Sequence, residues 1–164
     1  MAITKQKKVE ITKKIEDAVK DAVSIVFVKF SGMTVKDTGE MRQSLRNGGV
    51  SYYVAKKTLI KRVLNSQGYT GGLPDMPGEI AIAWSSTDAT APARDIYEIG
   101  KKHKDSLTIV GGIWEGAFAD ALAMNAIATI PPVPVLRGMF VNVINSPIQG
   151  FVIALNQIAE KKTA

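Results

Sequence analysis

The stretch "SIVFVKF", residues 24–30, is a short run of β-branched and aromatic residues and predicts a strand. Residues 4–22, before it, place apolar side chains at near-helical spacing with lysines on the other faces. After it, Thr34 can cap a helix over residues 35–47, which the pair Gly48–Gly49 would end. The chain therefore opens as helix, strand, helix.

The same alternation continues along the chain. Strands are predicted over residues 50–56, 79–85 and 106–116, with a bulge at the glycine pair 111–112. Helices are predicted over residues 58–67, 89–103 and 119–128. This order predicts an α/β fold, a small layered sheet with helices, over residues 1–130. Residues 131–134, "PPVP", predict a stiff linker, and residues 135–164 predict a C-terminal helical extension.

Composition excludes several classes of function. The 164 residues include no cysteine, so disulfides and thiolate-bound metals are excluded. Neither the P-loop nor the dinucleotide fingerprint is present. The single histidine, His103, falls at a predicted helix end, where its charge complements the helix dipole. No catalytic residue, metal site or cofactor is therefore predicted, and no signal peptide is expected. An α/β enzyme with a pocket near His103 or Glu115 is the weakest alternative.

Charge is distributed unevenly along the chain. Residues 1–62 carry 14 Lys and Arg against 6 Asp and Glu, whereas residues 63–164 carry 7 against 9. A basic first third predicts a site for a polyanion, and we expect its two basic segments to share one side of the domain. The Thr58 hydroxyl and nearby N–H groups at a helix N-terminus suit a phosphate. The basic residues assigned to this site are Lys5, Lys7, Lys8, Lys13, Lys14, Lys56, Lys57, Lys61 and Arg62.

The C-terminal segment contains an internal repeat. "FVNVINS", residues 140–146, aligns with "FVIALNQ", residues 151–157, at an offset of 11 residues, close to three helical turns. Each unit presents a Phe and an aliphatic residue four positions later on one face, as helices that dock into grooves do. Burying one such pair contributes about 3–6 kcal/mol before association costs. The residues assigned to partner binding are Leu136, Phe140, Val141, Ile144, Ile148, Phe151, Val152, Leu155 and Ile158.

Three other interpretations of this segment compete. A membrane-spanning helix is disfavoured by Arg137 and several Asn and Gln residues. A peripheral membrane anchor would favour a polar face rich in Lys and Arg, whereas this one has lysines only at its end. Packing on the domain's own core is disfavoured by the proline linker and by apolar residues on most sides. Pro147 and Gly150 also predict a bend or break between the two repeats, residues 140–146 and 151–157.

The whole chain resembles the L-ten family of bacterial ribosomal proteins. "FSGMTVKDTGEMRQSLRNGGVSYYVAKKTLIKRVL" is similar to the family's R-G-x-T-V, L-R and V-K-N-T-L series, "VGGIWEG" to its G-G-x-x-E-G strand, and "SPIQGFVIALN" to its P-I-x-G-(L/F)-V-x-x-L-N repeat. The family has Arg where this chain has Ser31, and Asn where it has Lys57. The first departure removes a cationic contact and the second adds a charge.

The resemblance implies a structural, non-enzymatic protein of the large ribosomal subunit, cytoplasmic and ribosome-bound. It implies that residues 1–130 bind large-subunit rRNA beside protein L-eleven, and it adds the Gly32 loop to the RNA contacts. It also implies that the terminal helix carries dimers of the acidic stalk protein L-seven/L-twelve, which recruit translational GTPases. Two clear repeats predict two dimers. A peripheral membrane protein anchored by the helix is the main alternative.

Overall fold

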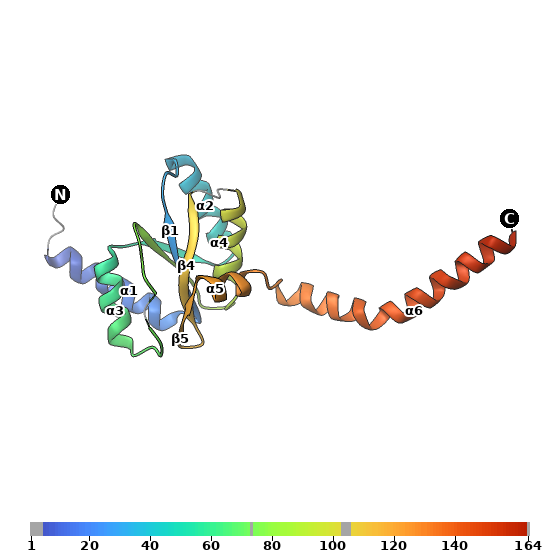
Figure 1. The fold of residues 1–164 in the computed structure, drawn as a ribbon. Coiled ribbons are helices and arrows are strands. Elements are labelled where there is room, and N and C mark those ends of the chain that lie inside the picture. Colours follow the sequence, from blue (N-terminus) through green and yellow to red (C-terminus); the bar gives the residue numbers. More distant parts are fainter. Residues whose placement is uncertain (1–4, 73, 103–105, 164) are drawn as a thin grey trace. The chain divides into compact units, whose positions relative to one another are not determined.

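A computed structural model of the chain describes residues 5–72, 74–102 and 106–163. The chain divides into two compact units, Met1–Ile130 and Pro131–Ala164 (Figure 1). The first is an α/β domain and the second is a single long helix. The α/β class and the helical extension predicted from the sequence are both confirmed.

A five-stranded sheet in the order β2-β3-β1-β4-β5 forms the centre of the first unit. Its strands are β1 (Ser24–Phe30), β2 (Ser51–Val54), β3 (Ile80–Ser85), β4 (Leu107–Trp114) and β5 (Ala117–Asp120). Every neighbouring pair is antiparallel. Strand β1 lies in the middle, with Phe27 opposite Ile82 on one side and Gly111 on the other.

Helices cover both faces of the sheet. Figure 1 shows α1 (Lys5–Asp21) and α3 (Lys57–Gln67) on one face, and α2 (Val35–Asn47), α4 (Ala91–Lys102) and α5 (Ala121–Ala128) on the other. Successive strand residues point to opposite faces, so β1 contributes to two separate cores. Phe27 packs with the residues beneath α1 and α3. Val26 and Val28 pack with those beneath α2, α4 and α5.

Several predicted boundaries are confirmed by their local hydrogen bonds and dihedral angles. The Thr34 Oγ1 accepts a hydrogen bond from the Asp37 N–H at 3.2 Å and begins α2 as expected. The helix ends at Gly48, and Gly49 takes a φ of +73°, a conformation that glycine adopts at low cost. Helix α3 ends at Gly68, as the sequence predicts.

The sequence-based prediction is wrong around residues 115–120. A strand over 106–116 followed by a helix from 119 was expected, but a tight turn at Glu115 and Gly116 separates β4 from a second strand, β5. Both turn residues have positive φ, 49° and 78°, as a two-residue hairpin of type I′ requires. Helix α5 therefore begins only at Ala121. The predicted bulge is confirmed, because the register of β1 against β4 shifts beside Gly111.

The second unit is helix α6, Val133–Thr163. It begins two residues before the expected start, so Val133 and Pro134 are helical rather than part of the linker. Proline fits there because N–H groups in a first turn have no partner within the helix. The helix also continues through Pro147, so of the predicted bend or break there is no break, and Figure 1 shows a bend part-way along the helix.

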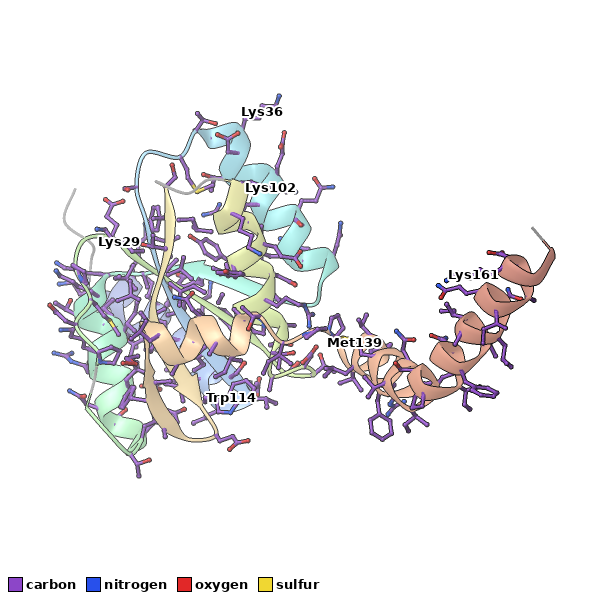
Figure 2. The ribbon with its side chains drawn as sticks, turned by 45° about the vertical axis from the view of Figure 1, so that its right-hand side comes forward. Lys29, Lys36, Lys102, Trp114, Met139 and Lys161 are labelled. Atoms are coloured by element: carbon purple, nitrogen blue, oxygen red, sulfur yellow. The ribbon has the colours of Figure 1, made fainter. Side chains whose placement is uncertain are left out.

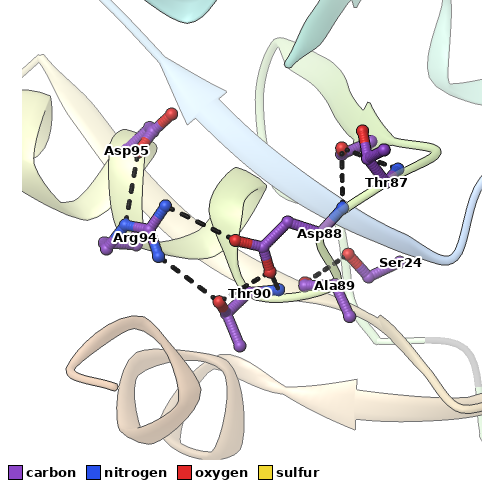
Figure 3. Close-up of polar contacts among 8 residues, drawn as sticks. Ser24, Thr87, Asp88, Ala89, Thr90, Arg94 and Asp95 are labelled. Carbon is purple, nitrogen blue, oxygen red and sulfur yellow. Dashed lines mark hydrogen bonds and ion pairs between the residues drawn. The ribbon is translucent and has the colours of Figure 1, made fainter. Parts of the chain in front are cut away.

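A polar network fixes the N-terminus of α4 (Figure 3). The Asp88 carboxylate accepts hydrogen bonds from the Thr90 N–H and hydroxyl, both at 2.9 Å. Arg94 reaches Asp88 at 3.7 Å and Asp95 at 3.6 Å. Burial acts to raise the pKa of Asp88, but the Thr90 hydrogen bonds and the Arg94 charge outweigh it, and the pKa is lowered. Burial raises the pKa of Asp95, and Arg94 offsets this only in part.

These opposite shifts predict opposite effects of two neutralising substitutions. The lowered pKa of Asp88 means that its charge stabilises the fold above the pKa of the unfolded chain and that this is lost in acid. The raised pKa of Asp95 means that its charge costs stability as the pH rises through the folded pKa. Urea unfolding at about pH 7 should show Asp88→Asn destabilising and Asp95→Asn stabilising, each by up to about 1 kcal/mol. Both differences should shrink toward about pH 3; equal signs at neutral pH would contradict this assignment.

Candidate nucleic-acid interface and partner helix

Helices α1 and α3 pack side by side and join the two basic segments of the sequence. Ile15 of α1 and Ile60 of α3 are buried in the same core, which sets the two helices in contact. A groove of about 380 Å³ lies along them, lined by Lys8, Val9, Thr12, Lys13, Glu16, Leu59 and Arg62. The prediction that the first helix and the second basic segment share one side of the domain is therefore confirmed.

A second cavity, of about 420 Å³, lies where α3 begins. It is lined by Phe30, Val54, Ala55, Lys56, Lys57, Thr58, Gly78, Glu79 and Ile80. Lys56 is the N-cap of α3 and makes no side-chain cap hydrogen bond, while its carbonyl accepts from the Leu59 N–H at 2.8 Å. The N–H groups of Lys57 and Thr58 precede the first N–H that donates to a carbonyl within the helix, so they take part in no helical hydrogen bond. Free N–H groups beside two ammonium groups suit an anion.

The other predicted RNA-binding residues are placed as follows. Gly32 is exposed with a φ of +70° in the loop after β1, at the end of the sheet that carries the Lys56–Thr58 cavity. Lys7 and Lys14 are exposed on α1 and line neither cavity. Lys61 is half-buried on α3. The Lys5 side chain and His103 lie outside the described residues.

Sequence reasoning missed one lysine near this cavity. Lys29, labelled in Figure 2, lies on β1. Its Cε is 3.4 Å from the point that a Cβ atom would occupy if Gly78, one of the cavity residues, carried one. Its half-buried position in a strand gave no sign of this. The pairing of Lys29 with Ile80, the first residue of β3, brings it there.

The lysines of these two cavities are free to meet an external anion. Within residues 5–72, 74–102 and 106–163, ion pairs form at Lys36 with Glu40 and at Arg94 with its two aspartates, and none includes a cavity lysine or Arg62. Each cavity has one carboxylate in its lining, Glu16 in the groove and Glu79 at the start of α3. Positive charge therefore predominates at both places.

Every side chain assigned to partner binding on α6 is exposed. The exposed fraction is 68% at Phe140 and 66% at Phe151, far above that of a packed aromatic residue. Figure 2 shows side chains projecting from several sides of this helix. Two such aromatic residues, 11 positions apart, lie about 16.5 Å apart along the axis and on nearly the same face.

The helix also meets the length and composition that a membrane span requires. Residues Val133–Lys161 form one apolar helix of 29 residues, and none of its apolar window is buried. A single helix of this kind is weak evidence for a membrane role, because length and apolar composition are also what a docking helix needs.

Comparison with known proteins decides the family. The family described as ribosomal protein L10 matches residues 3–101, more than half of the chain. The chain belongs to the ribosomal protein L10 family. It is 34% identical over 160 residues to large ribosomal subunit protein uL10 of Clostridium acetobutylicum, covering 98% of this chain and 95% of that one. The uL10 proteins of Staphylococcus carnosus and Shouchella clausii are 32% and 33% identical and are covered over 93% and 94% of their lengths.

Membership of the family fixes the general role. The protein is a structural constituent of the large ribosomal subunit, cytoplasmic and ribosome-bound, and it is not an enzyme. Of the two positions that the enzyme alternative named, Glu115 is an exposed residue of the β4–β5 turn, and His103 lies outside the described residues.

Exposure of α6 predicts that its aromatic residues contribute little to the stability of the domain. Phe140→Ala and Phe151→Ala should change the free energy of unfolding of the first unit by less than about 0.5 kcal/mol, as surface substitutions do. Phe27→Ala, at a fully buried position, is the matched control and should cost about 3–5 kcal/mol. Urea denaturation followed by tryptophan fluorescence measures all three. A large loss in Phe140→Ala would show that this side chain packs on the domain.

Proposed function

We propose that the first unit binds large-subunit rRNA through the surface formed by α1, α3 and the Lys56–Thr58 turn. The observation that supports this most directly is the packing of α1 on α3, which gathers Lys8, Lys13 and Arg62 around one groove. Lysine ammonium groups act as point charges and suit the phosphate backbone better than base edges. Lys7, Lys14 and Lys61 extend the same positive field.

The turn at the start of α3 is the second phosphate position on this surface. Lys56 and Lys57 flank two N–H groups that the helix leaves free. Lys57 stands where the family has Asn, so it supplies a charge next to the loop where Ser31 replaces the family's Arg. The Gly32 loop lies at the same end of the sheet and completes the surface in this proposal.

We propose that α6 carries dimers of the acidic stalk protein L-seven/L-twelve, one for each repeat. Exposure of both Phe residues and of their aliphatic partners supports this, because apolar surface of this extent on a helix marks an interaction site. Each dimer would cover Phe140 with Val141 and Ile144, or Phe151 with Val152 and Leu155. These dimers would recruit translational GTPases, so the chain would contact those enzymes only through them. Protein L-eleven would be its neighbour at the rRNA.

The rRNA surface is tested by the salt dependence of binding to protein-free large-subunit rRNA. Lys57→Gln with Arg62→Gln should weaken binding and reduce the slope of log affinity against log salt by about 1.4–1.8, because two phosphate contacts are lost. Lys36→Gln with Lys101→Gln removes the same charge from α2 and α4 and is the matched control. If both pairs change the slope equally, the α1–α3 surface is not the site.

The partner helix is tested by native mass spectrometry of the full chain co-expressed with the acidic stalk protein. Two added dimers are expected. Phe140→Asp and Phe151→Asp should each remove one dimer, because a charge replaces the apolar anchor, whereas Gln149→Ala should keep both. A third dimer would assign a further site near Leu136. A chain that carries no dimer but sediments with liposomes would favour the membrane anchor instead.

A further inference from the structure

A third cavity lies on the other side of the sheet edge from the lysine surface. It has a volume of about 230 Å³ and is lined by Arg42, Arg46, Val50, Ser51, Tyr52 and Trp84. Ser51 and Tyr52 belong to β2, the edge strand of the sheet, and Trp84 is paired with Ser51. None of these residues takes part in the proposed lysine surface.

Two arginines converge on this cavity because of their spacing. Arg42 and Arg46 are four residues apart on α2 and therefore lie on one face of it. Met41 and Leu45, their preceding neighbours, are buried and hold the helix against the sheet. No ion pair in the described part of the chain involves either arginine. Two exposed guanidinium groups without carboxylate partners are suited to bidentate contact with a phosphate.

Tyr52, Trp84 and Val50 form the apolar side of the cavity. The Arg42 guanidinium carbon lies 5.9 Å from the centroid of the Tyr52 ring. Burial raises the pKa of Tyr52 to about 12, with Arg42 acting in the opposite direction, so its hydroxyl keeps its proton and can donate a hydrogen bond. Guanidinium and aromatic groups together form the kind of surface on which unpaired nucleic-acid bases stack.

Strand β2 connects this cavity to the lysine surface. Ser51 lines the arginine cavity, and Lys56 and Val54 line the cavity at the start of α3. The five steps from Ser51 to Lys56 span at most about 17 Å of extended chain. An RNA strand that followed this sheet edge would therefore meet positive charge at both ends.

We propose that Arg42, Arg46 and Tyr52 form a second RNA subsite, which takes one phosphate and an adjacent unpaired base. This inference rests on the proposed rRNA-binding function and extends it to single-stranded RNA. A base inside a duplex is stacked and cannot enter a recess beside a tyrosine ring, whereas an unpaired base can. The arginines hold the backbone and the ring supplies the stacking surface.

The test compares two RNA probes with the full chain. One is a fluorescein-labelled oligouridylate of about 12 nucleotides, within the range that single-strand sites cover, and the other is a duplex of equal length. Arg42→Gln with Arg46→Gln should reduce the salt slope on the oligouridylate by about 0.7, because one phosphate contact is lost. Tyr52→Leu should weaken oligouridylate binding about 5- to 100-fold and leave duplex binding nearly unchanged, whereas Tyr52→Phe should retain most of it.

The outcomes separate this proposal from the rRNA surface. If the arginine pair and Tyr52→Leu bind the oligouridylate like the original chain while Lys57→Gln with Arg62→Gln loses binding, the subsite is wrong and the lysine surface stands. If no variant loses binding, both fail. If Tyr52→Leu weakens both probes equally, the base-stacking role is overturned. Urea midpoints identify any loss of fold, and the exposed arginine pair decides the result if Tyr52→Leu is unstable.

Discussion

The antiparallel pairing of β1 with β3 on one side and with β4 on the other is the constraint on which the domain depends. Phe27 is fully buried toward one face, and Val26 and Val28 are fully buried toward the other. A strand buried on both faces needs helices on both faces, and the helices that the structure describes in the first unit divide accordingly. At Gly112, strand β4 lies so close to β1 that a larger residue does not fit, since any Cβ there would collide with the Ile25 carbonyl and with Met124.

This division gives the domain two cationic surfaces of different chemistry. The face with α1 and α3 presents mainly lysines, which provide mobile point charges. The face with α2 presents two arginines beside a tyrosine, which offer planar groups and fixed geometry. The first combination suits a phosphate backbone irrespective of sequence, and the second suits a nucleotide whose base is free. Edge strand β2 borders both because only β3 pairs with it.

Local signals predicted much of this fold, and long-range signals were the ones missed. Helix α2 was placed correctly because Thr34 and Gly48 act within a few residues of its ends. Strand β5 was missed because Glu115–Gly116 is a weak hairpin signal and "AFAD" also fits a helix start. The basic groove was foreseen because its charges cluster along the sequence. The spacing of Arg42 and Arg46 was visible, but Tyr52 joins them only through the placement of α2 against β2, which no pattern in the sequence shows.

Pro147 has a consequence for how order spreads along α6. Proline carries no N–H, so the carbonyl of Val143, four residues earlier, receives no helical hydrogen bond from it. An interior proline costs a helix about 3 kcal/mol, which interrupts helix–coil propagation between the segments on either side. The two Phe-containing repeats stand on opposite sides of this interruption. Ordering one repeat therefore transmits little stability to the other, so that in the proposed docking role the two repeats would act as thermodynamically independent sites.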